Sequence, residues 1–332
     1  MPIPSVLRDR LALPVIGAPL FIVSGPELVI AQCKAGIVGS FPALNARPKE
    51  LLEEWIVQIK TELAAYQKAH PDRCVAPFAV NQIAHVSNDR LEHDAAVCVR
   101  HQVPITITSL RAPADIVKAV HAVGGIVLHD VINLRHAMKA LEDGVDGLIL
   151  VGAGAGGHAG TLSPFALLSE VRRRFAGTIA LSGAIANGAG ILAAQAMGAD
   201  LAYIGTRFVA TQEANARPEY KRMLVEASAS DIVYSSFFSG VHGNYLGPSI
   251  AAAGLDPRNL PEGDKSKMGF GSGGSSKSKV WRDIWGAGQG VGSITDVPDV
   301  AGCVARLQRE YLEAHADLLR RSFANAAPHA AE

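Results

Sequence analysis

The stretch VGAGAGGHAG, from Val151 to Gly160, contains the pattern G-x-G-x-x-G from Gly152 to Gly157 and continues at once with His158. Two structures are compatible with this stretch. In a doubly wound dinucleotide-binding fold, glycines at this spacing hold a pyrophosphate at the start of a helix. In a barrel of alternating strands and helices, they form a loop that carries a histidine beyond the carboxyl end of a strand. The flanking sequence distinguishes the two.

The sequence after the glycines departs from a dinucleotide-binding unit. In such a unit the helix begins inside the glycine motif, and an acidic residue ends the next strand. Here HAGTLSP intervenes before the next helical segment, and the following apolar run, TIALSGAI at 178–185, has no acidic residue. The glycine motif also follows the sixth apolar run of the chain rather than the first, where a dinucleotide-binding fold has it. These departures favour the barrel loop, with a tight turn and a surface histidine as the alternative.

Eight short apolar runs alternate with segments of helical periodicity. Each run is too short for a helix, is rich in Val, Ile and Leu, and lacks strict alternation, as expected of parallel strands buried on both faces. This pattern predicts a TIM (β/α)8 barrel, and a doubly wound sheet stays open because sequence does not show closure. The runs are PVIGAP (14–19), GIVGS (36–40), VAPFAVN (75–81), VPITITS (103–109), GIVLHD (125–130), GLILVGAG (147–154), TIALSGAI (178–185) and LAYIGTRF (201–208).

The alternation of apolar runs and helical segments ends after Phe208. A helix is expected from about Glu213 to Ala227, and the Gly/Ser/Lys-rich stretch at 269–279 is a flexible loop by composition. The GFGSGG in that stretch carries no weight, because no strand precedes it. We therefore expect a barrel unit over 1–230, a loop-rich, substrate-covering extension over 231–298, and an amphipathic C-terminal helix within 299–332 that packs on the barrel.

Composition limits the class of partner. Lys plus Arg and Asp plus Glu both number 31, so the long-range field typical of nucleic-acid or membrane-surface proteins is absent. The four cysteines lack zinc-site spacing, and no apolar run reaches the roughly 18 residues of a bilayer span. We expect a cytoplasmic protein with a small-molecule substrate, no metal, no nucleic acid and no membrane contact. Homodimer formation stays open.

Two loops stand where barrels commonly build a phosphate site from backbone N–H groups, after the seventh and eighth strands. They are SGAIANG at 182–188 and GTRF at 205–208. Ordinary turn chemistry is the alternative for both. His129, at the end of the fifth run, either points into the barrel mouth or is a core histidine. The candidate phosphate ligands are Ser182, Gly183, Ala184, Gly205 and Thr206.

With these motifs, the chain resembles the flavin-dependent nitronate monooxygenases, formerly called 2-nitropropane dioxygenases, and the related flavin enoyl reductases. The resemblance runs from about Leu13 to Thr211, with a looser echo in WGAGQGVG near Trp285. It rests on PVIGAPL, AGIVGS, FAVN, AGGHAG, SGAIANG and GTRF in that order. Their order and strand placement make the set specific for the family.

The resemblance implies an FMN across the barrel mouth, with His158 as the catalytic histidine beside the ring. Asn81 would hydrogen-bond the ring, unless its side chain caps a turn. Gly156 would pass close to the flavin. Asp130 stands where some relatives place a lysine near the cofactor, which alters the charge balance there. The flavin-side loop would be Ala18, Pro19 and Leu20, and the phosphate would bind Ser182, Gly183, Ala184, Gly205 and Thr206.

The resemblance also implies a reaction: oxidation of alkyl nitronates with O2 to carbonyl compounds and nitrite. His158 would donate a hydrogen bond to the nitro oxygens or, as a base, extend the activity to neutral nitroalkanes. The alternative keeps FMN and is an NAD(P)H-dependent reductase of a quinone or an enoyl thioester, although no nicotinamide site is recognisable. A flavin-free barrel isomerase or aldolase also stays open. Ser239, His242 and Tyr245 either line the substrate side or are ordinary loop polarity, and we favour loop polarity.

Overall fold

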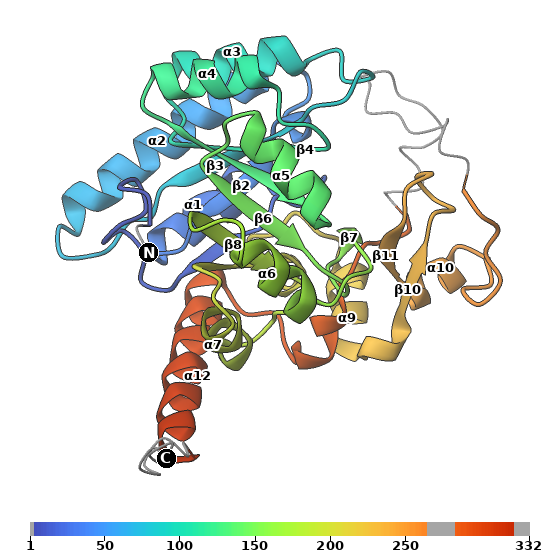
Figure 1. The fold of residues 1–332 in the computed structure, drawn as a ribbon. Helices are drawn as coiled ribbons and strands as arrows, with labels where there is room; N and C mark the ends of the chain where they lie inside the picture. Colours follow the sequence, from blue (N-terminus) through green and yellow to red (C-terminus); the bar gives the residue numbers. More distant parts are fainter. Residues whose placement is uncertain (1–2, 264–282, 322–332) are drawn as a thin grey trace, which may run out of the picture.

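A computed structural model describes residues 3–263 and 283–321, and its centre is an eight-stranded parallel sheet (Figure 1). The strand order is β1-β9-β8-β6-β5-β4-β3-β2. Every strand overlaps one of the eight apolar runs. The strands are β1 (Val15–Gly17), β2 (Gly39–Pro42), β3 (Phe78–Ile83), β4 (Ile105–Ser109), β5 (Ile126–Val131), β6 (Gly147–Val151), β8 (Thr178–Ser182) and β9 (Leu201–Ile204).

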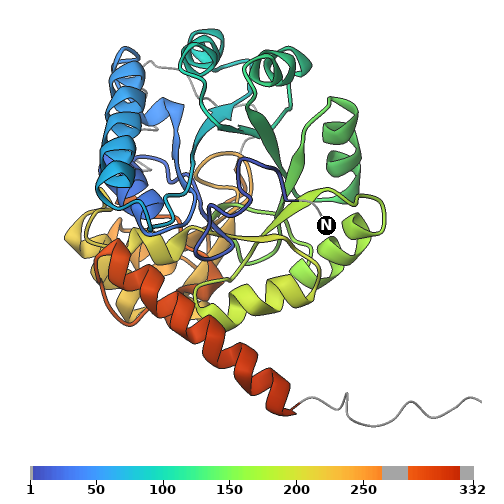
Figure 2. The ribbon, with the colours of Figure 1, turned by 90° about the vertical axis from the view of Figure 1, so that its left-hand side faces the viewer.

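Hydrogen bonds between the two ends of this order bring the sheet round into a nearly closed barrel. Gly17 N–H donates to the Val38 carbonyl at 2.8 Å, and Val38 N–H donates to the Val15 carbonyl at 3.0 Å. Ile16 and Val38 thereby form a parallel bridge. The predicted TIM-type barrel is confirmed and the doubly wound alternative is excluded. Figure 2 shows the helices as a ring around the strands.

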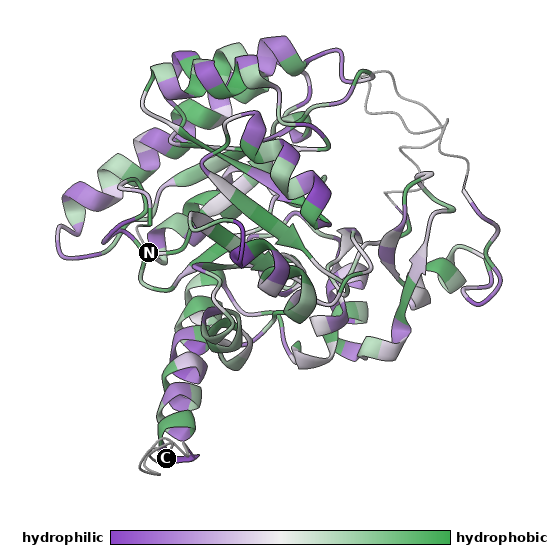
Figure 3. Cartoon of the chain, viewed as in Figure 1, coloured by the Kyte–Doolittle hydropathy of each residue, from purple (hydrophilic) through white to green (hydrophobic). Residues whose placement is uncertain are grey.

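Apolar side chains from all eight barrel strands or their immediate flanks meet in the interior. Leu7, from the N-terminal segment, belongs to the same buried cluster. The strands are correspondingly apolar in Figure 3, while the surrounding helices alternate between apolar and polar residues. The interior residues are Ile16, Val38, Ala79, Ile105, Ile107, Leu128, Ile149, Ala180 and Leu201.

Each barrel strand is followed by a helix, as the alternation of patterns predicted. Ser163 is the N-cap residue of the helix that begins at Pro164, and Gly144 and Gly198 follow helix ends with φ of 92° and 104°. Such positive φ values favour glycine. The helices are α1 (Pro26–Lys34), α2 (Leu51–Ala69), α3 (Leu91–Arg100), α4 (Ala114–Ala122), α5 (Leu134–Glu142), α6 (Pro164–Arg172), α7 (Gly188–Ala196) and α8 (Thr206–Val209).

The helix expected from Glu213 begins later than predicted. Helix α9 runs over Pro218–Glu226 and has proline at its first position. Proline disfavours helical backbone in the residue before it, and Arg217 is extended with ψ of 146°. Glu213 instead accepts the Val300 N–H with its carboxylate at 3.0 Å. The prediction was therefore wrong at the helix start.

A second, antiparallel sheet lies on the side of the barrel toward which the strand arrows point in Figure 1. It joins β10 (Ile232–Ser235), β11 (Gly243–Leu246) and β7 (Gly157–His158). The short helices η2 (Ala229–Asp231), α10 (Gly247–Ala252) and η4 (Gln289–Ser293) flank it in the sequence. GFGSGG and the stretch at 269–279 lie outside the described residues. Across residues 3–263 and 283–321, no helix is long and apolar enough to cross a membrane.

The C-terminal helix α12 (Val300–Arg321) packs against α7 and α1 and then extends beyond the barrel (Figures 1 and 2). Its predicted apolar face is buried at Val300, Val304 and Leu307, whereas Leu318 is 52% exposed. The contact with α7 is close at Gly188. A Cβ at Gly188 would lie 2.1 Å from the Tyr311 nitrogen and 2.4 Å from the Leu307 oxygen.

We expect Gly188→Ala to destabilise the fold by about 1–3 kcal/mol, because the added methyl group meets backbone atoms of α12 that cannot rotate away. Gly190→Ala is the matched control on the same helix. Its Cβ would come no closer than 3.3 Å to any neighbour, so its effect should stay within about 1 kcal/mol. Urea unfolding of the two variants measures both, and equal stabilities would contradict the close contact.

Candidate active site

The carboxyl end of the barrel interior is polar. Side chains alternate across a strand, so the residue two positions beyond each apolar interior residue also points into the barrel. On six strands that residue carries a hydroxyl, amide or carboxyl group. These residues are Ser40, Asn81, Ser109, Asp130, Ser182 and Tyr203. The mouth of the barrel is therefore built to meet a polar ligand, whereas the layer below excludes water.

Asn81, on β3, is buried inside the barrel and does not cap a turn. Its Nδ2 donates to the Ile107 carbonyl at 3.2 Å and to Ser109 Oγ at 2.8 Å. Ser109 Oγ in turn donates to Asp130 Oδ2 at 2.5 Å. Burial raises the pKa of Asp130, and the nearby His129, the Ser109 hydroxyl and the Leu110 N–H each oppose that rise. A linked amide, hydroxyl and carboxyl thus line one side of the mouth.

His129 faces away from this group. Its neighbours Leu128 and Asp130 point into the barrel, so alternation turns His129 toward the helices. Its Nδ1 lies 2.8 Å from Thr108 Oγ1, and the side chain is 5% exposed. Burial lowers the pKa of His129. The structure therefore favours the core histidine over a histidine in the mouth.

The flavin-side loop predicted at 18–20 lies next to the predicted phosphate loop. A Cβ at Gly205 would lie 3.6 Å from Ala18 Cβ and 3.4 Å from Leu20 Cδ2. Pro19, between them, is partly exposed. Asn45, which follows β2 in the short helix η1 (Ala43–Asn45), donates to the Leu20 carbonyl at 2.9 Å. The side chain of Asn45 therefore sets the course of this loop.

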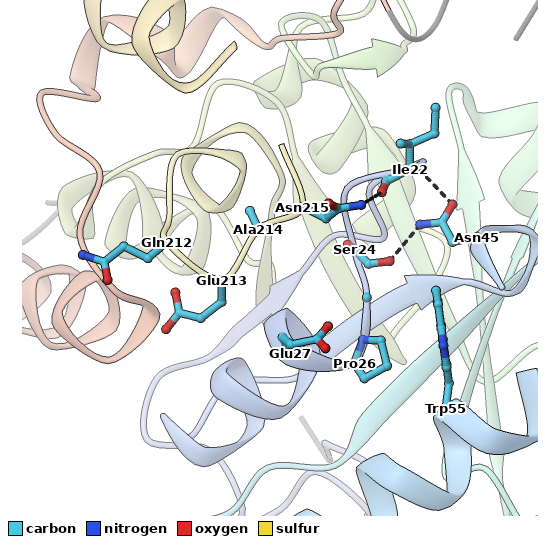
Figure 4. A pocket seen from close by; sticks show the side chains of 11 residues that line it. Ile22, Ser24, Pro26, Glu27, Asn45, Trp55, Gln212, Glu213, Ala214 and Asn215 are labelled. Atoms are coloured by element: carbon cyan, nitrogen blue, oxygen red, sulfur yellow. Dashed lines mark hydrogen bonds between the residues drawn. The ribbon is translucent and has the colours of Figure 1, made fainter. Parts of the chain in front are cut away.

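A pocket of about 740 Å³ lies behind the same loop and is drawn in Figure 4. Ile22 lines it with a φ of 67°, which is unusual for a β-branched residue. Asn45 accepts the Ile22 N–H, and Asn215 donates to the Ile22 carbonyl. Figure 4 shows both contacts. None of the predicted site residues lines this pocket, so it borders the site without being part of it.

The two predicted phosphate loops present unused backbone donors. In the described chain, the N–H groups of Gly183, Gly205 and Thr206 make no hydrogen bond, and neither does the Ser182 hydroxyl. The Ala184 N–H is different, because it donates to the Gly154 carbonyl at 3.3 Å. Four of the five predicted phosphate ligands therefore keep a free donor.

Arg207 does not add charge to these donors. It is buried, and its guanidinium donates to the Ala210 and Asp296 carbonyls at 2.8 and 2.9 Å. It also pairs with the Asp296 carboxylate at 3.6 Å. Its role is to join the end of α8 to the segment before α12.

Gly156 lies where the glycine-rich loop meets the segment at 285–290, which the sequence showed only as a loose echo. A Cβ at Gly156 would lie 2.8 Å from the Gly288 nitrogen and 3.2 Å from Thr206 Oγ1. Thr206 Oγ1 also accepts the Gly288 N–H at 2.9 Å. The absence of a side chain at Gly156 thus lets three distant segments meet. The predicted approach of Gly156 to the flavin stays a prediction.

His158 belongs to a β-strand and not to a simple loop. As part of β7 it is paired with Gly243 of β11. Its Nε2 lies 2.9 Å from Ser239 Oγ. Ser239 Oγ donates to the Val241 carbonyl at 2.9 Å and lies 3.3 Å from the Tyr245 hydroxyl. Ser239 and Tyr245, interpreted from the sequence as loop polarity, are therefore part of the histidine's surroundings.

Burial lowers the pKa of His158, so the ring is neutral at pH 7. Ser239 has one hydroxyl hydrogen, and the Val241 carbonyl accepts it. With the Ser239 hydrogen directed to that carbonyl, His158 Nε2 is assigned the proton that it shares with Ser239, and Nδ1 is assigned the lone pair. This tautomer gives the ring a basic nitrogen.

Three further residues lie around the loop of His158; sequence reasoning missed Asn244 and Tyr220 and included Trp285 only in a loose echo. Buried Asn244 donates to the Ala155 carbonyl at 2.6 Å. Tyr220 stacks on Trp285 with ring centroids 4.8 Å apart, and its hydroxyl donates to the Gly286 carbonyl. The sequence signals were weak: WGAGQGVG near Trp285 was only a loose echo, and in GNYL (243–246) Tyr245 favours a strand whereas Gly and Asn are depleted in strands.

The fold brings the predicted site residues to one end of the barrel. Ten of the eleven follow or end β1, β9, β8 and β6, which are neighbours in the sheet. Asn81 alone comes from β3, on the other side of the mouth. A ligand that touches all of them has to lie across the mouth of the barrel.

The chain matches a known protein family and a curated relative. The family model described as nitronate monooxygenase matches residues 8–247. A curated nitronate monooxygenase from Paraburkholderia phytofirmans is 27% identical over 361 aligned positions, covering 94% of this chain and 95% of that protein.

Two solved structures share the fold over almost their whole length. FabK of Thermotoga maritima has a TM-score of 0.74 at 22% identity and covers 96% of this chain and 99% of its own. A nitroalkane oxidase from Streptomyces ansochromogenes has a TM-score of 0.71 at 22% identity, with 95% and 100% covered. At this identity both show the fold alone. With the family model matched over most of the chain, the protein belongs to the nitronate monooxygenase family of oxidoreductases.

Proposed function

We propose that this enzyme oxidises alkyl nitronates with O2 to carbonyl compounds and nitrite, using FMN bound across the barrel mouth. The observation that carries the proposal is the neutral His158, bonded to Ser239 at the same end of the barrel as the unused N–H groups. Family membership supports it. The relative from Paraburkholderia phytofirmans bears the name of this activity.

The residues at the mouth fit FMN. A phosphate needs several converging donors, and Gly183, Gly205 and Thr206 offer unengaged N–H groups beside the Ser182 hydroxyl. The Asn81 amide oxygen, which has no partner within the described residues, remains for a donor on the ring. Once bound, FMN supplies the redox chemistry, and the protein supplies position and electrostatics.

His158 is suited to removing a proton. Its Nδ1 lone pair could accept the hydrogen on a carbon next to a nitro group, a step that neutral nitroalkanes need and anionic nitronates do not. Ser239 keeps this tautomer by accepting the Nε2 proton. We therefore include neutral nitroalkanes among the proposed substrates.

The extension completes the site in this proposal. The described part of residues 231–298 supplies Ser239 and the strand that pairs with His158, which supports the predicted place of this extension on the substrate side of the barrel at 1–230. The helix in 299–332 packs at the side of the barrel and contributes no predicted site residue. Homodimer formation and a cytoplasmic location stay predictions.

The first prediction of this function concerns the cofactor and electron donor. The purified protein should show a flavin spectrum, and propionate 3-nitronate added without oxygen should bleach it. NADH alone should leave it unchanged. Rapid bleaching by NADH would instead support a quinone or enoyl thioester reductase. A colourless protein that does not take up FMN would contradict the flavin site altogether.

The second prediction concerns His158. His158→Asn should lower kcat/KM for nitroethane by about 10²–10⁴, the usual contribution of a positioned base, and that for ethyl nitronate much less. Ser239→Ala should affect nitroethane in the same direction by a smaller factor, because the ring is no longer held in one tautomer. Steady-state kinetics with both substrates test this. Equal losses on both substrates would argue against a base.

The third prediction follows from the lowered pKa of His158. Its ordinary value is 6.5, so on acidification the unfolded chain binds a proton before the folded protein does. Stability contributed by the neutral ring is present above pH 6.5 and is lost as the pH falls through that value toward the lower folded pKa.

Urea unfolding between pH 7 and pH 5 should therefore show a steeper loss of stability in the wild type than in His158→Asn. The difference should be at most about 1.4 kcal/mol per pH unit, the limit for one proton. A His158→Asn slope equal to that of the wild type would disprove the assignment.

A further inference from the structure

The carboxyl group of Asp130 lies inside the barrel mouth and has no part in the mechanism above. We propose that Asp130, acting through Ser109 and Asn81, opposes negative charge on an FMN bound at the mouth and makes that flavin harder to reduce. The inference rests on the proposed function only in taking FMN as the ligand of the mouth. In this proposal Asp130 orients Asn81 and acts on the flavin through its charge, and it is not a catalytic residue.

A chain of hydrogen bonds links Asp130 to Asn81 through Ser109. Asp130 Oδ2 accepts from Ser109 Oγ at 2.5 Å, so the single hydrogen of that hydroxyl is committed to the carboxyl group. Ser109 Oγ must then be the acceptor of the 2.8 Å bond from Asn81 Nδ2. The two N–H bonds of the Asn81 amino group donate to the Ile107 carbonyl and to Ser109 Oγ. This arrangement fixes the direction of the Asn81 amide oxygen. The carboxyl group thus sets the direction of the amide that would meet the ring.

The charge of Asp130 is not balanced by a cation in the described part of the chain. Among residues 3–263 and 283–321, no Lys or Arg side chain forms an ion pair with Asp130. The groups near it are the Ser109 hydroxyl, the Leu110 N–H and the Tyr203 hydroxyl on β9, together with the adjacent His129 ring on the other face of the strand. His129 is directed at Thr108 and its lowered pKa keeps it neutral at pH 7. The pKa of Tyr203 is raised by burial and by Asp130, so the phenol stays neutral too.

The charge of Asp130 determines in which direction the midpoint potential of bound FMN changes. Reduction adds electrons to the flavin and increases the negative charge on its ring. In its ionised form Asp130 disfavours that charge, because its surroundings have a low dielectric constant, whereas a neutral amide at the same place does not. Asp130→Asn should therefore strengthen binding of reduced FMN relative to oxidised FMN. We expect a factor of about ten, which for a two-electron couple corresponds to a rise of about 30 mV in the midpoint potential.

The test measures the midpoint potential of bound FMN at pH 8 by anaerobic reduction with a reference dye. Asp130→Asn keeps the shape of the side chain and its acceptor for Ser109. Asp146→Asn is the matched control, because Asp146 also accepts a backbone N–H, from Val127 at 2.7 Å, but precedes β6 at the opposite end of the barrel. A rise in Asp130→Asn with no rise in Asp146→Asn supports the proposal. Equal potentials in the wild type and Asp130→Asn overturn it.

Ser109→Ala tests the relay with the carboxyl group still present. If Asp130 acts through Ser109, this variant should also change the midpoint potential, and its combination with Asp130→Asn should give less than the sum of the two shifts. Additive shifts would overturn the relay. This variant also serves if Asp130→Asn does not fold.

Acidification gives a second readout. As the pH falls through the pKa of Asp130, the carboxyl group becomes neutral, so the difference between the wild type and Asp130→Asn should disappear. A difference that persists unchanged to low pH would contradict an electrostatic origin. If neither protein binds FMN, it is the proposed function that fails, and fluorescence titration of the apoprotein with FMN distinguishes that outcome.

Discussion

The hydrogen bonds between β1 and Val38 are the contact on which the rest of the structure depends. Without them the eight parallel strands would form an open sheet, with β1 at one edge and β2 at the other. Bringing these strands together places Asn81 of β3 across from the loops after β9 and β8. The carboxyl ends of all the strands then surround a single mouth, and polar residues can gather there because the apolar layer below is sealed.

A second constraint acts on the loop after β6. A glycine-rich loop has high conformational freedom, and fixing it costs entropy that its own sequence does not offset. The protein meets this cost with contacts from far along the chain. Gly157 and His158 pair with β11, Asn244 donates to the Ala155 carbonyl, and Gly288 lies against Gly156. The histidine is therefore placed by the extension as much as by the barrel.

Sequence patterns predicted the barrel well because the signal is local. Buried parallel strands need continuous apolar runs, and all eight runs became barrel strands. The strand-end motifs were also predictable, since the fold itself places such loops at one face. The start of α9 was misjudged because apolar periodicity outweighed the effect of Pro218 on its neighbour. The sequence did not single out Ser239 because its partner, His158, lies about eighty residues earlier, and Tyr245 lies next to Ser239 in the same group.

The sequence by itself thus determined the class of fold, the order of its strands along the chain and the loops that carry the site residues. These features follow from periodicity, glycine and proline, which act within a few residues. Only the tertiary structure decided that Asp130 points into the mouth while His129 points out, that Ser109 links Asp130 to Asn81, and that Ser239 bonds His158. Such contacts depend on strand register and on pairing between distant segments, and a hydrogen bond forms only when both set its two partners within about 3 Å.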